Sequence, residues 1–239
     1  MSLGLYLHIP YCFSKCRYCD FYSHPGERGV PDAYVDALLR ELSRFAPEAP
    51  LQPDTLYFGG GTPSLLRPEQ AKRLIDAARP MPGAEITLEA NPETVTEESL
   101  AGFRETGVNR ISFGVQSARD TQLRTLGRPH TAKQARAAFA AAQRAGFTNI
   151  SGDIMLALPH YTEAEFDETL ELIEGGGATH ISAYLLKIEP GTPFATRELC
   201  LPDEDGAADL YLAAAGALEA RGSVSYTHLR AHETSAHLV

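Results

Sequence analysis

The segment Leu5–Ser23, LYLHIPYCFSKCRYCDFYS, joins an alternating strand pattern to a dense group of cysteines. Its first five residues alternate apolar and polar side chains, which predicts a β-strand with Tyr6 and His8 on one face. Three of the chain's four cysteines then fall within eight residues, in the pattern C-x3-C-x2-C: Cys12, Cys16 and Cys19. A strand that leads directly into three thiols predicts a metal centre at its carboxyl end.

Strand-like and helix-like segments alternate along the rest of the chain. Such alternation predicts βαβ units with parallel strands and an α/β fold. Right-handed crossovers place these strands side by side, as an open sheet or a partly closed barrel. The predicted strands are Leu3–Ile9, Thr55–Gly59, Glu85–Asn91, Arg110–Gln116, Ile150–Leu158 and His180–Glu189. The predicted helices are Asp32–Phe45, Pro68–Ala78, Thr96–Glu105, Ala132–Ala145, Glu163–Glu174 and Glu204–Ala220.

The composition is that of a globular protein, with 239 residues and a formal net charge of −10. A charge of that sign argues against a broad surface for nucleic acid or anionic membranes. No apolar run is long enough to span a membrane and the first residues lack the layout of a signal peptide, so we expect a cytoplasmic protein. Thiols stay reduced in that compartment, where clustered cysteines bind metal more often than they form disulfides.

Each predicted strand has one apolar face and one face that carries polar groups. In Glu85–Asn91, for example, Glu89 lies on the face opposite Leu88. Glu89, Gln116 and Asp153 lie within or at the carboxyl ends of three strands, where parallel barrels carry their active sites. If these faces converge, the strands enclose a polar cavity; if they do not, the same residues are solvated strand positions.

Three thiolates without a fourth restrict the kind of metal centre. Structural zinc takes four protein ligands, and here only His8 or His24 stands near enough in sequence to complete such a shell. Cys200 lies far along the chain and is expected to be an ordinary thiol. A [4Fe–4S] cluster held by three cysteines leaves one iron open for a small molecule, so both kinds of centre stay open at this point.

The spacing C-x3-C-x2-C, with Tyr18 before the third cysteine, resembles the signature of the radical S-adenosylmethionine (SAM) superfamily. The resemblance implies a partial (β/α)6 barrel, similar to a TIM barrel, and a [4Fe–4S] cluster on Cys12, Cys16 and Cys19. It also implies that SAM completes the open iron through its amino and carboxylate groups. The turn YFGGGTPS (Tyr57–Ser64) resembles the segment with which this superfamily holds the methionyl amino group, because glycines let backbone amides approach a ligand.

Sequence blocks narrow the resemblance to oxygen-independent coproporphyrinogen III dehydrogenases and their relatives, the heme chaperones HemW. The blocks are, in chain order, LYLHIPYC, GGGTP, LEANPE, RISFGVQS, LGRPH, GDIMLALP and IEPGTPF. The positions that resemble the SAM-contacting residues of this group are Tyr6, Gly60, Gly61, Thr62, Glu89, Gln116, Arg128 and Asp153, with Tyr18 beside the cluster. The carboxylate of Asp153 and the amide of Gln116 suit ribose hydroxyls, and the carboxylate of Glu89 suits an ammonium. The guanidinium of Arg128 suits a carboxylate.

Two features separate the two kinds of relative. The dehydrogenase carries a further cysteine two residues after the third cluster cysteine, where this chain has Phe21, and it has a longer N-terminal extension. Both differences favour the heme chaperone, which implies heme or a porphyrin as a ligand and heme-acceptor proteins as partners. Oxidative decarboxylation of coproporphyrinogen III to protoporphyrinogen IX is the alternative, and a zinc-stabilised barrel without redox activity is the third hypothesis.

The resemblance ends after Gly222, so we expect a core domain over residues 1–222 and a tail over residues 223–239. The tail, SVSYTHLRAHETSAHLV, has no strand or helix period and resembles a translated sequencing adapter more than a protein segment. We expect it to be disordered and its histidines, His228, His232 and His237, to have no role. The H-N-x-x-Y-W motif tied to heme binding in the family is missing, so we expect the cluster and SAM positions to remain without the heme site.

Overall fold

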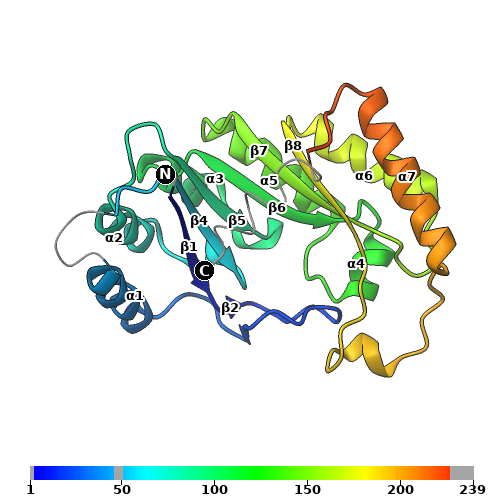
Figure 1. Cartoon of the computed structure of the whole chain (residues 1–239), viewed down its shortest axis with the longest axis horizontal. Helices are drawn as coiled ribbons and strands as arrows, with labels where there is room; N and C mark the ends of the chain where they lie inside the picture. Colours follow the sequence, from blue (N-terminus) through cyan, green and yellow to red (C-terminus); the bar gives the residue numbers. More distant parts are fainter. Residues whose placement is uncertain (1–2, 46–50, 227–239) are drawn as a thin grey trace.

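The computed structural model describes residues 3–45 and 51–226, and its centre is one sheet of six parallel strands (Figure 1). The strands follow one another across the sheet in chain order, and each pairs in parallel with the next. Among the described residues the two outer strands do not pair with each other, so the barrel is open and the predicted partial α/β barrel is confirmed. The strands are β1 (Gly4–Ile9), β4 (Thr55–Gly60), β5 (Glu85–Ala90), β6 (Arg110–Gln116), β7 (Asn149–Leu156) and β8 (His180–Leu185).

Most helices lie in a layer against the outer face of this sheet. Neighbouring helices touch in chain order, α1 with α2, α2 with α3, α3 with α5, α5 with α6 and α6 with α7. Figure 1 shows α1 and α2 near β1 and β4 at one end of the molecule, and α6 and α7 near β8 at the other. The helices are α1 (Asp32–Phe45), α2 (Pro68–Ala78), α3 (Glu97–Glu105), α4 (Asp120–Leu126), α5 (Ala132–Arg144), α6 (Glu163–Gly175) and α7 (Glu204–Ala220).

Several short elements lie in the connections, and the sequence predicts none of them. They are the helix α4, the strands β2 (Tyr11–Cys12) and β3 (His24–Pro25), and the 3₁₀ turns η1 (Pro63–Leu65), η2 (Pro92–Thr94) and η3 (Pro193–Thr196). Elements this short carry too few residues to show a period in the sequence. Apart from β3, each of them follows the carboxyl end of a sheet strand, so they shape that edge of the barrel.

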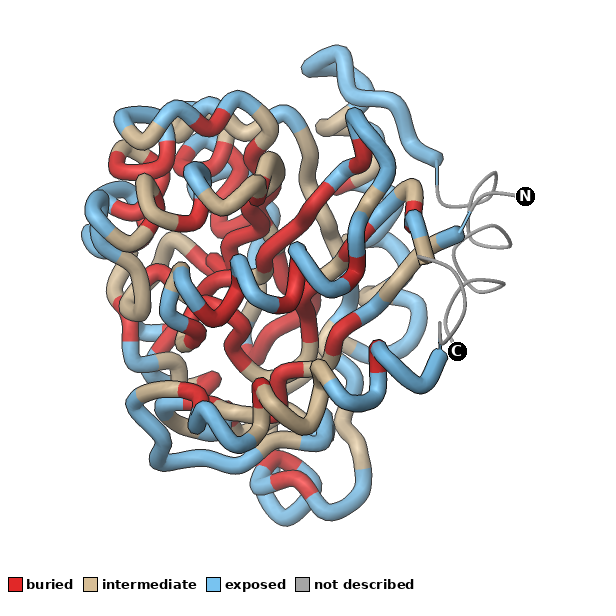
Figure 2. Tube along the Cα trace, turned by 90° about the vertical axis from the view of Figure 1, so that its left-hand side faces the viewer, coloured by how far each residue is buried: buried red, intermediate tan, exposed pale blue. Residues whose placement is uncertain are grey.

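The hydrophobic core lies between the sheet and the helices. Strand residues such as Ile9, Phe58 and Leu88 are fully buried and belong to one cluster with Leu74 of α2 and Phe139 of α5. Figure 2 shows the buried residues gathered in the interior of the layers, with exposed residues along the outer turns. This packing decides which set of alternate residues in each strand faces the helices.

The other parity of the strands faces the interior of the open barrel. In register, Glu89 of β5 lies beside Ser112 of β6, and Asp153 of β7 lies beside Ser182 of β8. The polar faces therefore converge, as one of the two interpretations of the alternation predicts.

The carboxyl end of β6 is irregular. Its pairing with β7 shifts register between Phe113 and Gln116, and Gln116 has a φ of 69°, which residues other than glycine seldom adopt. The backbone N–H of Ser117 donates to the carbonyl of Val115 over 2.9 Å, so Gln116 is the middle residue of a γ-turn. A turn with positive φ at a residue other than glycine is strained, and surrounding contacts must hold it.

The predicted boundary at Gly222 falls just after α7. Ser223–Tyr226 continue without regular structure, and the Tyr226 hydroxyl is in hydrogen-bond contact with His180 Nε2. The rest of the predicted tail, including its histidines, lies outside the described residues. Over the two ranges that the structure describes, no helix has the length and apolar character required to cross a membrane.

Candidate functional site

A cavity of about 290 Å³ opens at the carboxyl ends of the strands, which is close to the lower bound of ligand pockets, roughly 300 Å³. All predicted site residues except Tyr6 line it: Cys12, Cys16, Tyr18, Cys19, Gly60, Gly61, Thr62, Glu89, Gln116, Arg128 and Asp153. The fold thus brings the cysteine segment together with side chains from the ends of β4, β5, β6 and β7.

Tyr6 is the exception among the predicted residues. Its ring stacks on Tyr57 with centroids 5.9 Å apart, and its hydroxyl lies 3.3 Å from His8 Nδ1. The other ring nitrogen of His8 lies 2.9 Å from the carbonyl of Tyr22, to which it donates. This pair therefore connects β1 to the far end of the cysteine loop, and a contact between Tyr6 and SAM stays a prediction.

The cysteine loop begins and ends in a short parallel pair of strands. β2 pairs with β3, with Cys12 opposite Pro25, so the two ends of the loop lie together. Cys12 and Cys16 are buried, Cys19 is partly buried, and all three are free thiols. The remaining cysteine, Cys200, is exposed and lies at a different cavity.

Arg17 anchors the middle of the cysteine loop, and sequence reasoning missed it. Its backbone N–H donates to the carbonyl of Leu126 over 2.9 Å, and its own carbonyl accepts from Phe194 N–H over 3.0 Å. Its guanidinium donates to the carbonyls of Arg124 and Thr125, 3.0 and 3.1 Å away, at the end of α4. A cation at a helix C-terminus satisfies carbonyls that have no partner within the helix.

Two side chains lie within hydrogen-bond reach of the cysteine sulfurs. The Thr62 hydroxyl lies 3.6 Å from Cys12 Sγ, and Arg128 Nη1 lies 3.5 Å from Cys16 Sγ. Burial raises the pKa of the Cys19 thiol, although a hydrogen bond from the backbone of Phe21 opposes the rise. A guanidinium and a hydroxyl can both donate hydrogen bonds to thiolate sulfur, which is the form that binds metal.

The glycine turn after β4 approaches the cysteine loop too closely for side chains. A Cβ at Gly61 would lie 2.7 Å from the carbonyl oxygen of Tyr11 and 3.0 Å from Cys12 Sγ. Gly60 has a φ of 114°, and its N–H donates to Glu89 over 3.2 Å. The turn therefore forms one wall of the cavity and holds the Glu89 carboxylate in place.

Two carboxylates share the cavity and have raised pKa values. Burial raises the pKa of Glu89, against hydrogen bonds from Tyr57 and Gly60. Burial, and then the charge of Glu89, raises the pKa of Asp153 to about 7, against a hydrogen bond from Ser182. A cationic or hydroxyl-bearing ligand offsets both causes, because it replaces lost hydration and separates the two charges.

Two buried polar atoms at the cavity have no hydrogen-bond partner in the part of the chain that the structure describes: Arg128 Nε and Ser14 Oγ. A buried donor without a partner is costly, so each favours a ligand that accepts a hydrogen bond. Sequence reasoning also missed Tyr184, whose hydroxyl donates to Gln116 Oε1 over 2.8 Å. Strand parity could have found it, since Tyr184 lies in register beside Met155 on the interior face.

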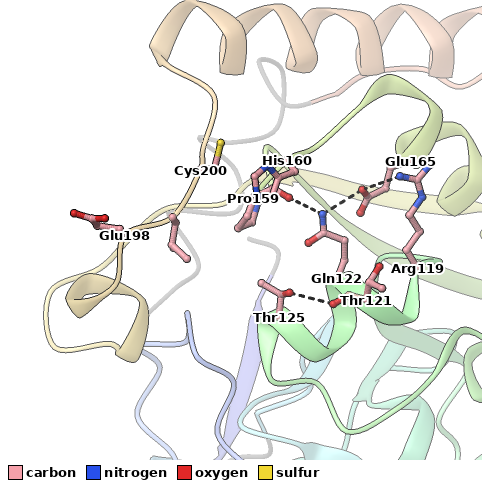
Figure 3. Close-up of a pocket in the computed structure, with 10 residues that line it drawn as sticks. Arg119, Thr121, Gln122, Thr125, Pro159, His160, Glu165, Glu198 and Cys200 are labelled. Carbon is pink, nitrogen blue, oxygen red and sulfur yellow. Dashed lines mark hydrogen bonds and ion pairs between the residues drawn. The ribbon is translucent and has the colours of Figure 1, made fainter.

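A second cavity of about 420 Å³ lies outside the barrel, between α4, the β7–α6 connection and residues 198–200 (Figure 3). Its buried carboxylate, Glu165, already accepts from Ser117 Oγ at 3.0 Å and from Gln122 Nε2 at 3.3 Å. Arg119 Nη1 lies 3.5 Å from the same carboxylate. None of the three clustered cysteines lines this cavity, so the chemistry of the cluster belongs to the first one.

Comparison with known families gives a match over most of the chain. The family model described as the radical SAM superfamily matches residues 6–173. The chain belongs to the radical SAM superfamily.

Curated relatives and solved structures agree with this membership. The chain is 39% identical to the heme chaperone HemW of Escherichia coli (strain K12), over 98% of this chain and 62% of the relative. It is 40% identical to HemW of Haemophilus influenzae, over 87% of this chain and 57% of the relative. The structure of the radical SAM enzyme coproporphyrinogen III oxidase (HemN) from Escherichia coli matches with a TM-score of 0.80 at 28% identity, covering 91% of this chain and 52% of that chain. This chain therefore spans about three fifths of the length of these two curated relatives.

Membership of the radical SAM superfamily implies a [4Fe–4S] cluster and SAM as cofactors, and the donor set fits both. In the described ranges, no three His, Cys, Asp or Glu side chains converge on a position for a single metal ion. Structural zinc needs four ligands on one ion, whereas a [4Fe–4S] cluster takes each thiolate on a separate iron. Three thiols that line one cavity therefore fit a cluster in which each thiolate binds a separate iron.

Proposed function

We propose that Cys12, Cys16 and Cys19 hold a [4Fe–4S] cluster and that SAM binds in the rest of the cavity. The observation that carries this proposal is the single cavity that joins the three thiols to polar side chains from four strands. A bound cluster supplies the electron that cleaves SAM in this superfamily.

The remaining residues of the cavity suit the parts of SAM. Glu89 offers a carboxylate to the methionyl ammonium, and the unpartnered Arg128 Nε offers a donor to the methionyl carboxylate. Asp153 and Gln116 suit the ribose hydroxyls at the far wall. Tyr18, whose pKa burial raises well above its usual value, lines the cavity as a neutral phenol and packs against Leu126, Met155 and Phe194.

We further propose that the whole protein is a heme chaperone of the HemW type, with heme as ligand and heme-acceptor proteins as partners. The similarity to proteins named heme chaperone HemW supports this, as does Phe21 in place of the further cysteine of the dehydrogenase. Its four free thiols suit a reducing compartment such as the cytoplasm. Cluster and SAM binding belong to the residues described here, and heme transfer belongs to the whole protein.

Anaerobic reconstitution with iron and sulfide tests the cofactor proposal. We expect a brown protein with iron–sulfur absorbance and SAM binding by isothermal titration calorimetry. A colourless protein that retains no iron would contradict it.

Two assays separate the heme chaperone from the dehydrogenase. We expect no conversion of coproporphyrinogen III with SAM and a reductant, and turnover would favour the dehydrogenase. Heme titration of a full-length version of the protein checks the chaperone assignment: we expect stoichiometric binding, and its absence would contradict the assignment.

A further inference from the structure

Glu93 and His130 form a buried pair just outside the cavity wall, and neither residue lines the cavity. The His130 side chain has no exposed surface and that of Glu93 is 10% exposed, with His130 Nδ1 3.4 Å from Glu93 Oε2. Among the described residues neither of these two atoms has a hydrogen-bond partner of its own. Both belong to sequence blocks, LEANPE and LGRPH, whose other polar residues line the cavity. The pair is therefore placed to support the cavity from behind.

The second ring nitrogen of His130 fixes the orientation of the ring. Nε2 lies 3.1 Å from the carbonyl oxygen of Val115, which can only accept, so Nε2 carries a proton. Nδ1 lies 3.4 Å from Glu93 Oε2, so the ring is held in one orientation between that carboxylate and the Val115 carbonyl.

The carbonyl that His130 holds is the one that closes the strained turn at the end of β6. Val115 also accepts from Ser117 N–H, and Gln116 between them has a φ of 69°. The preceding carbonyl, that of Gly114, accepts from Arg128 Nη2. The tripeptide Arg128-Pro129-His130 thus holds two successive carbonyls of the irregular end of β6, with Arg128 at the cavity and His130 behind it.

We propose that His130, oriented by Glu93, is a positioning residue for the cofactor. It donates to the Val115 carbonyl and so keeps the γ-turn closed. The closed turn directs the Gln116 side chain into the cavity, where its Oε1 accepts a hydrogen bond from the Tyr184 hydroxyl. His130 acts only through the backbone, because it does not line the cavity. This inference rests on the proposed function in so far as SAM is the ligand.

Three substitutions of His130 separate the two contacts of the ring. In His130→Gln, the amide nitrogen replaces Nε2 and still donates to Val115. In His130→Leu both contacts are lost, and in His130→Asn the amide replaces Nδ1 and reaches only Glu93. We expect His130→Gln to bind SAM within about threefold of the unchanged protein, and the other two to bind it about tenfold more weakly. Titrations are made anaerobically on reconstituted protein without a reductant.

Hydrogen exchange at the Ser117 amide gives a readout that needs no cofactor. We expect faster exchange in His130→Leu and His130→Asn and unchanged exchange in His130→Gln, with equal iron content in all. Asn109→Leu is the matched control: Asn109 bonds the backbone of Ala84 and Ile86 at the other end of the sheet, so its loss lowers stability without changing SAM affinity.

The outcomes distinguish this inference from the proposed function. If the unchanged protein binds SAM and all three His130 variants bind it equally well, the inference is overturned. If the unchanged protein does not bind SAM, the proposed function fails, and exchange at Ser117 alone decides whether His130 holds the turn. Should the leucine variant not fold, the asparagine and glutamine variants still give opposite expected results.

Discussion

The middle of the sheet and its β8–α7 edge are built from the same repeat of strand and helix, yet they are packed differently. Every residue of β6 after Arg110 is buried, whereas every residue of β8 is at least partly exposed. α2 buries several of its residues, and α7 buries only Ala214. Strands with neighbours on both sides exclude water from both faces, and an edge strand does not.

This difference shows which part of the fold holds the cavity side chains in fixed positions. The cavity is lined by the cysteine loop and by residues at or after the ends of β4 to β8, and the buried core sets the positions of the inner strands β4 to β7. The β8–α7 edge leaves Leu212 67% exposed and Tyr211 38% exposed, and Tyr211 lines a groove of about 760 Å³ between the strand and the helix. Substitutions near the cavity should therefore change cofactor binding or stability strongly, and substitutions at the edge should be tolerated.

The largest expected effect lies in the cysteine loop. Cys12→Ala, Cys16→Ala and Cys19→Ala should each abolish cluster retention, because each removes one of the three thiolates proposed to hold the cluster. Cys200→Ala is the matched control and should retain iron like the unchanged protein, since Cys200 is exposed and lines the other cavity. Iron and sulfide content after anaerobic reconstitution is the measurement. Equal iron in a clustered-cysteine variant and in the control would contradict the assignment.

A pair of leucine substitutions tests the contrast in packing directly. Leu170 of α6 is fully buried and Leu212 of α7 is 67% exposed. Leu170→Ala should lower the free energy of unfolding by about 2–5 kcal/mol, through lost burial and a cavity. Leu212→Ala should change it by less than about 0.5 kcal/mol. Urea unfolding followed by circular dichroism measures both, and similar losses would show that the edge is packed as tightly as the middle.

The pH dependence of stability tests the buried carboxylates. The pKa of Asp153 is about 7 in the folded protein and 3.8 when unperturbed, so the folded state holds a proton that the unfolded state has released between these values. Stability of the cofactor-free protein should therefore fall as pH rises from about 4 to 7, by at most about 4 kcal/mol from this group.

Asp153→Asn removes that titration and should flatten the pH dependence of unfolding. Glu89 remains in the variant, and its raised pKa keeps a smaller slope of the same sign. Urea unfolding at pH 5 and pH 8 gives the comparison. An unchanged difference between the two pH values would mean that Asp153 is already ionised at the lower one.

The last comparison places the same substitution at two glycines, and the expected changes in stability have opposite signs. Gly61→Ala places a Cβ against backbone and sulfur atoms that cannot move away, and should cost about 1–3 kcal/mol. Gly216→Ala, in α7, meets nothing within 4 Å and should stabilise the protein by about 0.5–1 kcal/mol. Melting temperatures of the two variants test this, and a stabilised Gly61→Ala protein would disprove the close contact.

Much of the fold can be predicted from the sequence because long elements repeat their period. The strand Arg110–Gln116 and the helices Asp32–Phe45, Pro68–Ala78 and Glu204–Ala220 have the predicted bounds. The predicted strand His180–Glu189 ends instead at Leu185, because the chain leaves the sheet where no further partner strand follows.

The sequence predicts which residues line the cavity but not the contacts that hold them in place. Strand parity and the spacing of the cysteines indicate which side chains share the cavity, since both depend on neighbours in sequence. From the sequence, His130 follows Arg128-Pro129 in a connection, where a histidine could contact a ligand but more often has no role, and the structure buries it against Val115. Arg17 likewise gives no signal, because its partners, Leu126 and Phe194, are more than a hundred residues away. Contacts of that range depend on the tertiary fold.

The two backbone bonds of Arg17 have a consequence for biogenesis. The cysteine loop lies near the start of the chain, and its anchors come from α4 and from η3, near residue 194. Contacts between such distant segments form late, because a long loop must close before they are gained. If the loop holds the proposed cluster, iron can enter a preorganised loop only after the chain as far as η3 has been synthesised and folded, and the three thiols of a shorter nascent chain lack these anchors.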